Sequence, residues 1–79
     1  MKINAIKCLI CGDIIYSRAR HDFHSCKCGE TSIDGGFDYM RVIAPSGYDN
    51  VEIEVDTTEA DLYKDWNEGI DKFGHSNDL

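Results

Sequence analysis

The sequence predicts a small α+β fold, in which an antiparallel β-sheet is followed by one C-terminal amphipathic helix. Three observations predict it. Short β-branched and aromatic runs alternate with turn residues early in the chain, residues 51–56 alternate apolar and acidic side chains, and residues 57–74 carry apolar side chains at helical spacing. Because the chain has only 79 residues, these elements are expected to form a single domain, residues 1–79.

The first half of the chain is predicted to form a β unit over residues 1–43. Residues 2–7 alternate polar and apolar side chains and lead directly into the first cysteine pair, which predicts a short strand. Residues 14–16 are β-branched and aromatic and predict a second strand. Residues 17–24 are polar and basic, so they are expected to form the loop that returns to the second cysteine pair.

A hairpin is predicted directly after the second cysteine pair. Residues 30–34 and residues 37–43 are its strands, and the two glycines between them tolerate the positive φ that hairpin turns require. Pro45 marks the end of the second strand, because proline cannot donate to a sheet ladder.

The last part of the chain, residues 51–74, is predicted to be an acidic strand followed by a helix. Residues 51–56 place apolar side chains on one face and carboxylates on the other. From Thr57 onward, apolar side chains recur at helical spacing and form one stripe. The stripe consists of Leu62, Trp66, Ile70 and Phe73. Residues 75–79 are expected to be a frayed tail.

Both ends of the predicted helix carry capping residues. Asp56, Thr57 or Thr58 can accept hydrogen bonds from the first turn, and Gly74 is a natural residue to follow the last turn. Gly69 then lies inside the helix, where a glycine costs about 1 kcal/mol relative to alanine.

Four cysteines form two closely spaced pairs, Cys8-x-x-Cys11 and Cys26-x-Cys28, with 14 residues between the pairs. Such spacing lets both sulfur atoms of a pair reach one metal ion, and the intervening length suits a hairpin that brings the pairs together. A core this small also calls for a covalent or metal staple. The sequence therefore predicts one structural Zn²⁺ ion bound by all four cysteines in a zinc-ribbon-like fold, with an atypically short second pair.

Other states of the cysteines remain open at this point, namely two disulfides, four free thiols or an iron centre. The first residues lack the apolar run of a signal peptide, and no stretch approaches the roughly 18 apolar residues of a membrane span. The expected compartment is therefore the cytoplasm, where thiols stay reduced.

His21 and His24 flank the second cysteine pair. Because four cysteines already complete a tetrahedral shell, these imidazoles are expected to lie outside it or to face solvent, although either could replace a cysteine. An enzyme would need a second metal ion near His21, His24 and Asp38, and no nucleophile–base spacing supports one. The sequence therefore predicts a protein that is not an enzyme.

The net charge of −7 is unevenly distributed along the chain. Residues 1–48 carry six Lys/Arg and five Asp/Glu, whereas residues 49–79 carry two and ten. The acidic half is interpreted as a protein-binding face, as a mimic of a nucleic-acid backbone, or as a means of solubility alone. The partner-binding residues in the first interpretation are Glu52, Glu54, Asp61 and Asp65.

The alternative function is that of a nucleic-acid-binding zinc ribbon. Its phosphate contacts would come from a small basic set, Arg18, Arg20, Lys27 and Arg41. Nucleic-acid-binding domains usually have a clear excess of basic residues, which this chain lacks. Nucleic acid is therefore the less favoured partner.

Residues 8–41 contain, in order, the motifs CxxCGDII, RHDF, CxCG and IDGGFDYMR. These motifs resemble a family of short uncharacterised zinc-ribbon-like proteins of bacteria and phages. In that family a strand pair after the CxCG knuckle carries a DGGxxYxR element, which residues 34–41 match. The resemblance implies no activity. A phage origin would imply that the protein binds a host protein, such as a defence nuclease, as an inhibitor or modulator.

Together these observations predict a protein-interaction module, in which one zinc ion organises a small β-sheet and an acidic face binds a protein partner. No membrane partner is expected. The sequence carries no signal for the oligomeric state.

Overall fold

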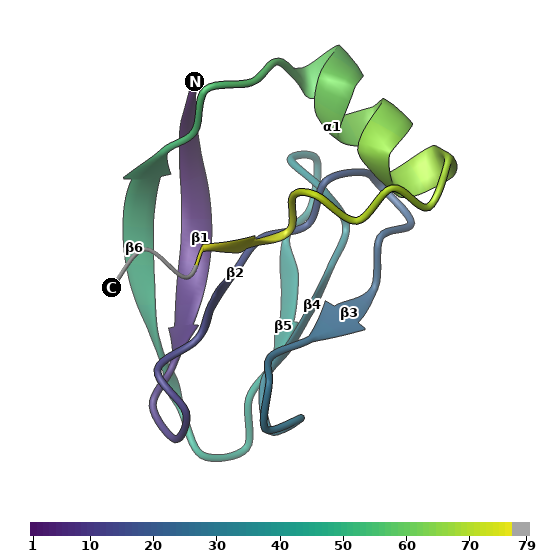
Figure 1. Ribbon diagram of the computed structural model, residues 1–79. Helices are drawn as coiled ribbons and strands as arrows, with labels where there is room; N and C mark the ends of the chain where they lie inside the picture. The colour runs from purple at the N-terminus through teal and green to yellow at the C-terminus, as the bar shows by residue number, and fades with distance from the viewer. Residues whose placement is uncertain (77–79) are drawn as a thin grey trace.

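The computed structural model describes residues 1–76 and confirms a small α+β fold with two antiparallel sheets and one helix (Figure 1). In chain order the elements are β1 (Lys2–Cys8), β2 (Ile14–Ile15), β3 (His24–Ser25), β4 (Ser32–Asp34), β5 (Arg41–Ile43), β6 (Tyr48–Glu54), α1 (Glu59–Asn67) and β7 (His75–Ser76). The rest of the predicted tail, residues 77–79, lies outside the described residues. Within residues 1–76, no helix has the length and apolar character that a membrane crossing requires.

The larger sheet has the strand order β6-β1-β2-β7 and is built around β1. β1 pairs with β6 along its whole length, from Lys2 opposite Glu54 to Cys8 opposite Tyr48. β6 therefore begins three residues earlier than the predicted strand at residues 51–56, because the added residues complete the ladder with the end of β1.

The edge of this sheet opposite β6 is formed by β7, a strand that the sequence did not predict. β2 pairs with β1 and also with β7, where Ile15 lies opposite His75 and Ile14 opposite Ser76. The N–H of Tyr16 continues the contact by donating to the carbonyl of Gly74 at 3.0 Å. The prediction of a frayed tail is therefore wrong at residues 75–76, which are held by pairing with a strand 60 residues earlier in the chain.

The smaller sheet has the order β3-β4-β5, and β5, the second strand of the predicted hairpin, is shorter than predicted. Residues 37–40 form a turn, and β5 begins only at Arg41. Gly36 explains why, because it has a φ of +58° and packs so closely on the backbone of Ala19 that an added Cβ would lie 2.8 Å away. The chain is thereby pulled toward the loop at residues 17–24 before it can return as a strand.

Two apolar clusters lie on opposite faces of the larger sheet. On one face, Ile3 and Ala5 of β1 contact Leu62 of α1, together with Ile14 and Tyr16. On the other face, Ile6 and Cys8 of β1 and Ile15 of β2 pack on Cys26, Ile33 and the partly buried Val42. Alternation along β1 thus serves both clusters, so the molecule has a helix layer, a central sheet and a second sheet.

The start of α1 agrees with the capping residues seen in the sequence. Thr58 is the N-cap, and its hydroxyl accepts a hydrogen bond from the N–H of Asp61 at 3.2 Å. Leu62 is fully buried and Trp66 is partly buried, which are the first two positions of the predicted apolar stripe. The first half of the predicted helix is therefore confirmed.

The end of α1 is different from the prediction. The N–H groups of Gly69 and Ile70 donate to the carbonyls of Trp66 at 3.3 Å and Asp65 at 3.0 Å, and Gly69 has a φ of +65°. This is the Schellman pattern that ends a helix. Gly69, and not Gly74, is thus the C′ residue, and Ile70 is turned outward with 55% of its surface exposed.

Candidate metal centre

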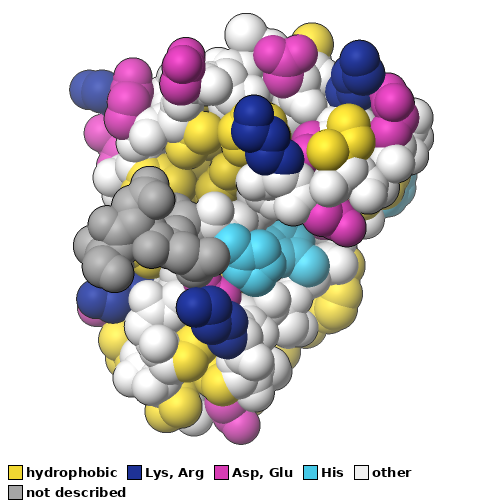
Figure 2. All heavy atoms as spheres, in the orientation of Figure 1, with side chains coloured by type: hydrophobic (Ala, Val, Ile, Leu, Met, Phe, Trp, Pro, Cys, Tyr) yellow, Lys and Arg dark blue, Asp and Glu magenta, His cyan; other side chains and the backbone are white. Residues whose placement is uncertain are grey.

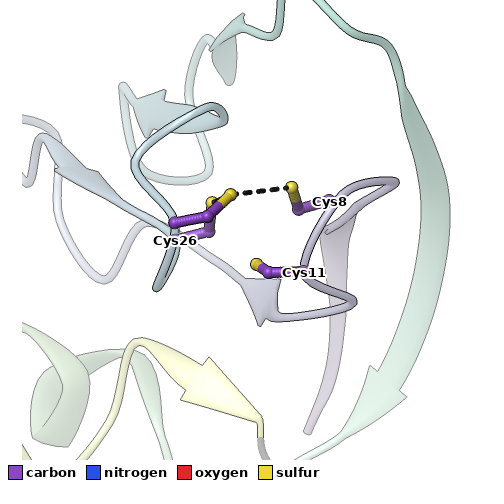
Figure 3. A group of neighbouring side chains, drawn as sticks. Cys8, Cys11 and Cys26 are labelled. Carbon is purple, nitrogen blue, oxygen red and sulfur yellow. Dashed lines mark hydrogen bonds between the residues drawn. The ribbon is translucent and has the colours of Figure 1, made fainter.

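The four cysteines come from two turns at one end of the molecule. Cys8 ends β1 and Cys11 lies in the turn after it, whereas Cys26 directly follows β3 and Cys28 lies in the turn before β4. Their sulfur atoms all lie within 4.8 Å of one another. Figure 3 shows the side chains of Cys8, Cys11 and Cys26 pointing into the space between the two turns. The arrangement can hold a metal ion.

The distances between sulfur atoms fit a tetrahedral ion. A Zn–S bond of about 2.3 Å places the sulfur atoms of a regular tetrahedron ~3.8 Å apart. The Sγ atom of Cys28 lies 3.6 Å from that of Cys8 and 3.5 Å from that of Cys26. A small contraction separates these distances from the ideal value, so the four cysteines fit a single tetrahedral ion with sulfur ligands.

Both turns close with the same backbone span, although the cysteine spacing differs. The N–H of Cys8 donates to the carbonyl of Asp13 at 2.9 Å, and the N–H of Cys26 donates to the carbonyl of Thr31 at 2.8 Å. Each hydrogen bond joins a cysteine to the residue five positions later. The short C-x-C spacing therefore changes the position of Cys28 within the second turn, but the turn itself still forms.

Electrostatics also favour a cation between these sulfur atoms. The hydroxyl of Thr31, followed by backbone N–H groups, lowers the pKa of Cys8 to about 6, and the backbone of Asp13 lowers the pKa of Cys11. The backbone of Glu30 lowers the pKa of Cys28, but burial and the three neighbouring cysteines outweigh it and raise this pKa to about 12. Four thiolates cannot coexist here without a positive charge to offset their repulsion.

Comparison with known protein families gives a match over residues 1–44 to a family model described as "Domain of unknown function (DUF7695)". The chain belongs to this family. Searches of the curated proteins and of the solved structures find no match. The DUF7695 match agrees with the predicted membership of an uncharacterised family, and it covers β1 to β5 and all four cysteines.

Asp13 lies within residues 1–44 and is a structural residue that the sequence-based predictions missed. Its carboxylate is fully buried, and Oδ2 lies 3.1 Å from the N–H of Lys27 and 2.9 Å from Nδ1 of His75. Asp13 therefore ties the first cysteine turn to the second and to β7. The other oxygen, Oδ1, is buried and has no hydrogen-bond partner among the described residues. An acidic residue directly after a CxxCG turn was the available signal.

Arg18 lies at the centre of a buried ionic cluster that joins the DUF7695 region to the rest of the chain. Its Nε atom lies 2.8 Å from Oδ2 of Asp22, and its terminal nitrogen NH1 lies 2.8 Å from Oδ2 of Asp65 and 3.1 Å from Oδ1 of Asp71. Only 8% of its surface is exposed. The hydrogen bond with Asp22 raises the pKa of Arg18 above its ordinary value, so the guanidinium stays charged.

This cluster corrects two predictions, one for a nucleic-acid-binding residue and one for a partner-binding residue. Arg18 was placed in the basic set for nucleic acid, but its guanidinium is enclosed by carboxylates and cannot face a phosphate. Asp65 was placed on the acidic face, but it is buried and also accepts the N–H groups of Lys72 at 2.9 Å and Phe73 at 3.0 Å. Buried charge of this kind is paired within the fold and serves its architecture.

The other three basic residues predicted to contact nucleic acid are arranged separately. Arg41 pairs with Asp34 at 2.7 Å, Arg20 lies 3.7 Å from Asp38, and Lys27 is exposed between Cys26 and Cys28. Their charge is therefore partly compensated by nearby carboxylates.

The histidines also take separate positions. His24 bridges Asp22 and the carbonyl of Gly74, at 3.1 Å each, and its ring lies 5.2 Å from that of His75. Figure 2 shows histidine side chains gathered near the middle of the molecule. His21 is exposed, and Asp38 pairs with Arg20. Among residues 1–76, the four cysteines are the only group of three or more metal-ligating side chains that converge.

The exposed carboxylates of the C-terminal half lie close together in sequence. Glu52 and Glu54 belong to β6, Asp61 belongs to α1, and all three are exposed. Asp56 and Glu59, which lie between them, are exposed as well. We call these five residues the acidic segment. Figure 2 shows Asp and Glu side chains spread along the upper margin of the molecule, over the region of β6 and α1.

Proposed function

We propose that this protein is a structural-zinc interaction module that binds a protein partner through its acidic segment. The observation that carries the proposal is the convergence of the four cysteine sulfur atoms within 4.8 Å. Four thiolates complete the tetrahedral shell of a zinc ion and leave no open position for a substrate or an activated water molecule. The functional part of the molecule is then the surface that the ion stabilises.

The acidic segment is the part of that surface that supports partner binding best. Its carboxylates are exposed, and of the five only Glu54 has an ion-pair partner within residues 1–76, the terminal ammonium at 3.9 Å. Unpaired charge of one sign steers a partner of opposite charge and raises its association rate. In the finer form of this proposal, the resemblance to phage-encoded proteins makes the partner a host protein whose activity the module inhibits or modulates.

Metal analysis tests the first part of the proposal. Protein purified without added metal should contain one zinc ion per chain, and each cysteine-to-serine variant should bind it more weakly. A content of iron, or a full complement of disulfides with no metal, would contradict the structural-zinc assignment.

Partner capture tests the second part. A variant with Glu52→Gln, Glu54→Gln and Asp61→Asn should lose the partners that the zinc-loaded wild type retains from a host lysate. The matched control removes three exposed charges elsewhere, Glu30→Gln, Asp38→Asn and Glu68→Gln. Equal capture by both variants would show that the acidic segment is not the binding surface.

A further inference from the structure

β6 is an edge strand with one side free. It lies at the end of the order β6-β1-β2-β7, and within residues 1–76 its only sheet partner is β1. Its seven residues, Tyr48–Glu54, pair one to one with β1 and contain no bulge. A regular free edge of this length is a template for pairing with another chain.

The pairing at the end of the strand shows which backbone groups face outward. Met1 and Val55 exchange two hydrogen bonds, at 2.6 Å and 2.9 Å, and so form a hydrogen-bonded pair. Because such pairs alternate along an antiparallel ladder, Ile53 and Val51 also face β1 with their backbone groups. The N–H and carbonyl groups of Glu54, Glu52 and Asn50 therefore point away from β1.

The edge carries carboxylates where other proteins place lysine or proline as protection. Two copies paired through β6 would bring two rows of carboxylates together, which disfavours a second copy of this chain as the occupant. The negative charge of Glu54 is partly compensated, because Glu54 faces Lys2 across the ladder and lies near the terminal ammonium. Glu52 faces Asn4 and has no ion-pair partner among the described residues, so it is the carboxylate most available to a cation.

A hollow beside the same strand fits a long side chain with a charged end. It has a volume of about 370 Å³ and is lined by Asn4, Met40, Asn50, Val51 and Glu52. The Met40 thioether offers an apolar wall for the methylene groups of a lysine or arginine, while the amides and the carboxylate offer acceptors for its charged end.

We propose that the free edge of β6 binds an extended segment of a protein partner as an added antiparallel strand, with a lysine or arginine of that segment opposite Glu52. Main-chain hydrogen bonds to Asn50, Glu52 and Glu54 supply affinity for any extended segment, whatever its sequence. The cation opposite Glu52 makes the binding selective. The inference rests on the proposed protein-binding function and adds the partner's conformation and charge.

A synthetic peptide of ten residues that alternates lysine and valine tests the inference on the zinc-loaded full chain. Amide hydrogen exchange measured by NMR is the readout. Saturating peptide should slow exchange at the outward-facing amides of Asn50, Glu52 and Glu54 by at least about tenfold, because they become hydrogen-bonded in a ladder. The amides of Val51 and Ile53, already bonded to β1, should change much less.

Two controls separate strand addition from simple charge attraction. A peptide whose lysine residues are N-methylated on the backbone keeps the charge but lacks the N–H groups that would face Asn50, Glu52 and Glu54, and it should not protect these amides. Glu52→Gln should weaken binding of the lysine–valine peptide by about two- to fivefold, as expected for one cross-strand ion pair. Glu68→Gln, at the exposed end of α1, should leave it unchanged.

Several outcomes would overturn the inference. These are absence of binding, equal binding of the N-methylated peptide, or exchange that slows with protein concentration when no peptide is present. Equal binding of the N-methylated peptide, with weaker binding by the Glu52 variant, would leave the acidic segment as a partner-binding surface but remove strand addition. Failure of the lysate capture described above would instead remove the proposed function itself.

Discussion

At the scale of single residues, the charges that matter most for the fold are buried ones. Arg18 has charged partners on three sides, Asp22 in its own loop, Asp65 at the end of α1, and Asp71 beyond that helix. Its terminal nitrogen NH1 also lies 3.4 Å from the carbonyl of Phe73. A planar guanidinium with five donors can serve all of these acceptors at once, which the single ammonium of a lysine cannot do in the same geometry.

Replacement of Arg18 by methionine should therefore be severe. Arg18→Met leaves Asp22 and Asp65 buried without their cation, so the free energy of unfolding should fall by about 3–5 kcal/mol. Urea unfolding of the zinc-loaded protein measures this loss. Arg20→Met removes a charge that is 66% exposed and should change stability by less than about 0.5 kcal/mol. Similar losses in both variants would show that the buried cluster contributes little.

The pH dependence of Asp65 has a definite sign. Burial raises its pKa, but hydrogen bonds from Arg18 and from the backbone N–H groups of Phe73 and Lys72 outweigh this and lower it below the ordinary value of 3.8. A carboxyl with a lowered pKa in the folded state stabilises the fold fully above its unfolded pKa, and this contribution is lost as the pH falls through the folded value.

The stability lost in Asp65→Asn should accordingly be the same at pH 7 and at pH 5. Both values lie above 3.8, so Asp65 is ionised in the folded and unfolded states alike. Urea unfolding of the wild type and the variant, both with excess zinc, gives the difference at each pH. A difference that shrinks between pH 7 and pH 5 would mean that the folded pKa of Asp65 is not lowered.

At the scale of elements, local signals were reliable where a few neighbouring residues decide the structure. The strand at residues 2–7 and the N-cap at Thr58 follow from alternation and from a hydroxyl placed before a helix. β7 and the turn at residues 37–40 could not be found in this way. β7 exists because β2 offers it an edge, and the turn exists because Gly36 packs on Ala19.

Gly69 provides the sharpest test of an element boundary. Inside a helix, Gly69→Ala would raise the free energy of unfolding by about 1 kcal/mol. At the observed φ of +65°, the same change should lower it by about 1–2 kcal/mol, because an L side chain is strained in the left-handed region. Thermal unfolding distinguishes the two signs. Ala60→Gly, within α1, calibrates the helical cost at about 1 kcal/mol.

The candidate metal centre was easier to predict than the surface around it. Ligand spacing is a local property, so Cys8, Cys11, Cys26 and Cys28 could be grouped from the sequence, and their sulfur atoms do converge. Whether a charge faces solvent depends on contacts between distant segments. Arg18 and Asp65 are 47 residues apart, and neither one's burial leaves a trace in the residues beside it.

At the scale of the whole molecule, the candidate metal centre joins two turns in a protein whose apolar clusters are small. The radius of gyration is 11.4 Å, and each apolar cluster contains five buried residues. Cores of this size contribute little stability after the loss of chain entropy. Zinc bound by four cysteines supplies on the order of 10 kcal/mol in comparable small domains.

Removal of the metal should therefore unfold the protein as a unit. A chelator with a reducing agent should abolish the cooperative thermal transition and the slow amide exchange in β1, and added zinc should restore both. Near-ultraviolet and far-ultraviolet circular dichroism measure the two levels of structure. A metal-free protein that kept its cooperative transition would show that the two apolar clusters suffice alone.

The Arg18 cluster has a consequence for how much of this chain is needed for it to fold. The family model matches residues 1–44, yet the guanidinium inside that stretch also pairs with Asp65 outside it, and β1 finds its full-length ladder partner in β6. A fragment cut at residue 44 would carry Arg18 with Asp22 but without Asp65 and Asp71, and a long strand without its neighbour. The stretch that the family model matches is thus smaller than the unit that folds in this chain, whose C-terminal half supplies both a further counterion for Arg18 and the ladder partner of β1.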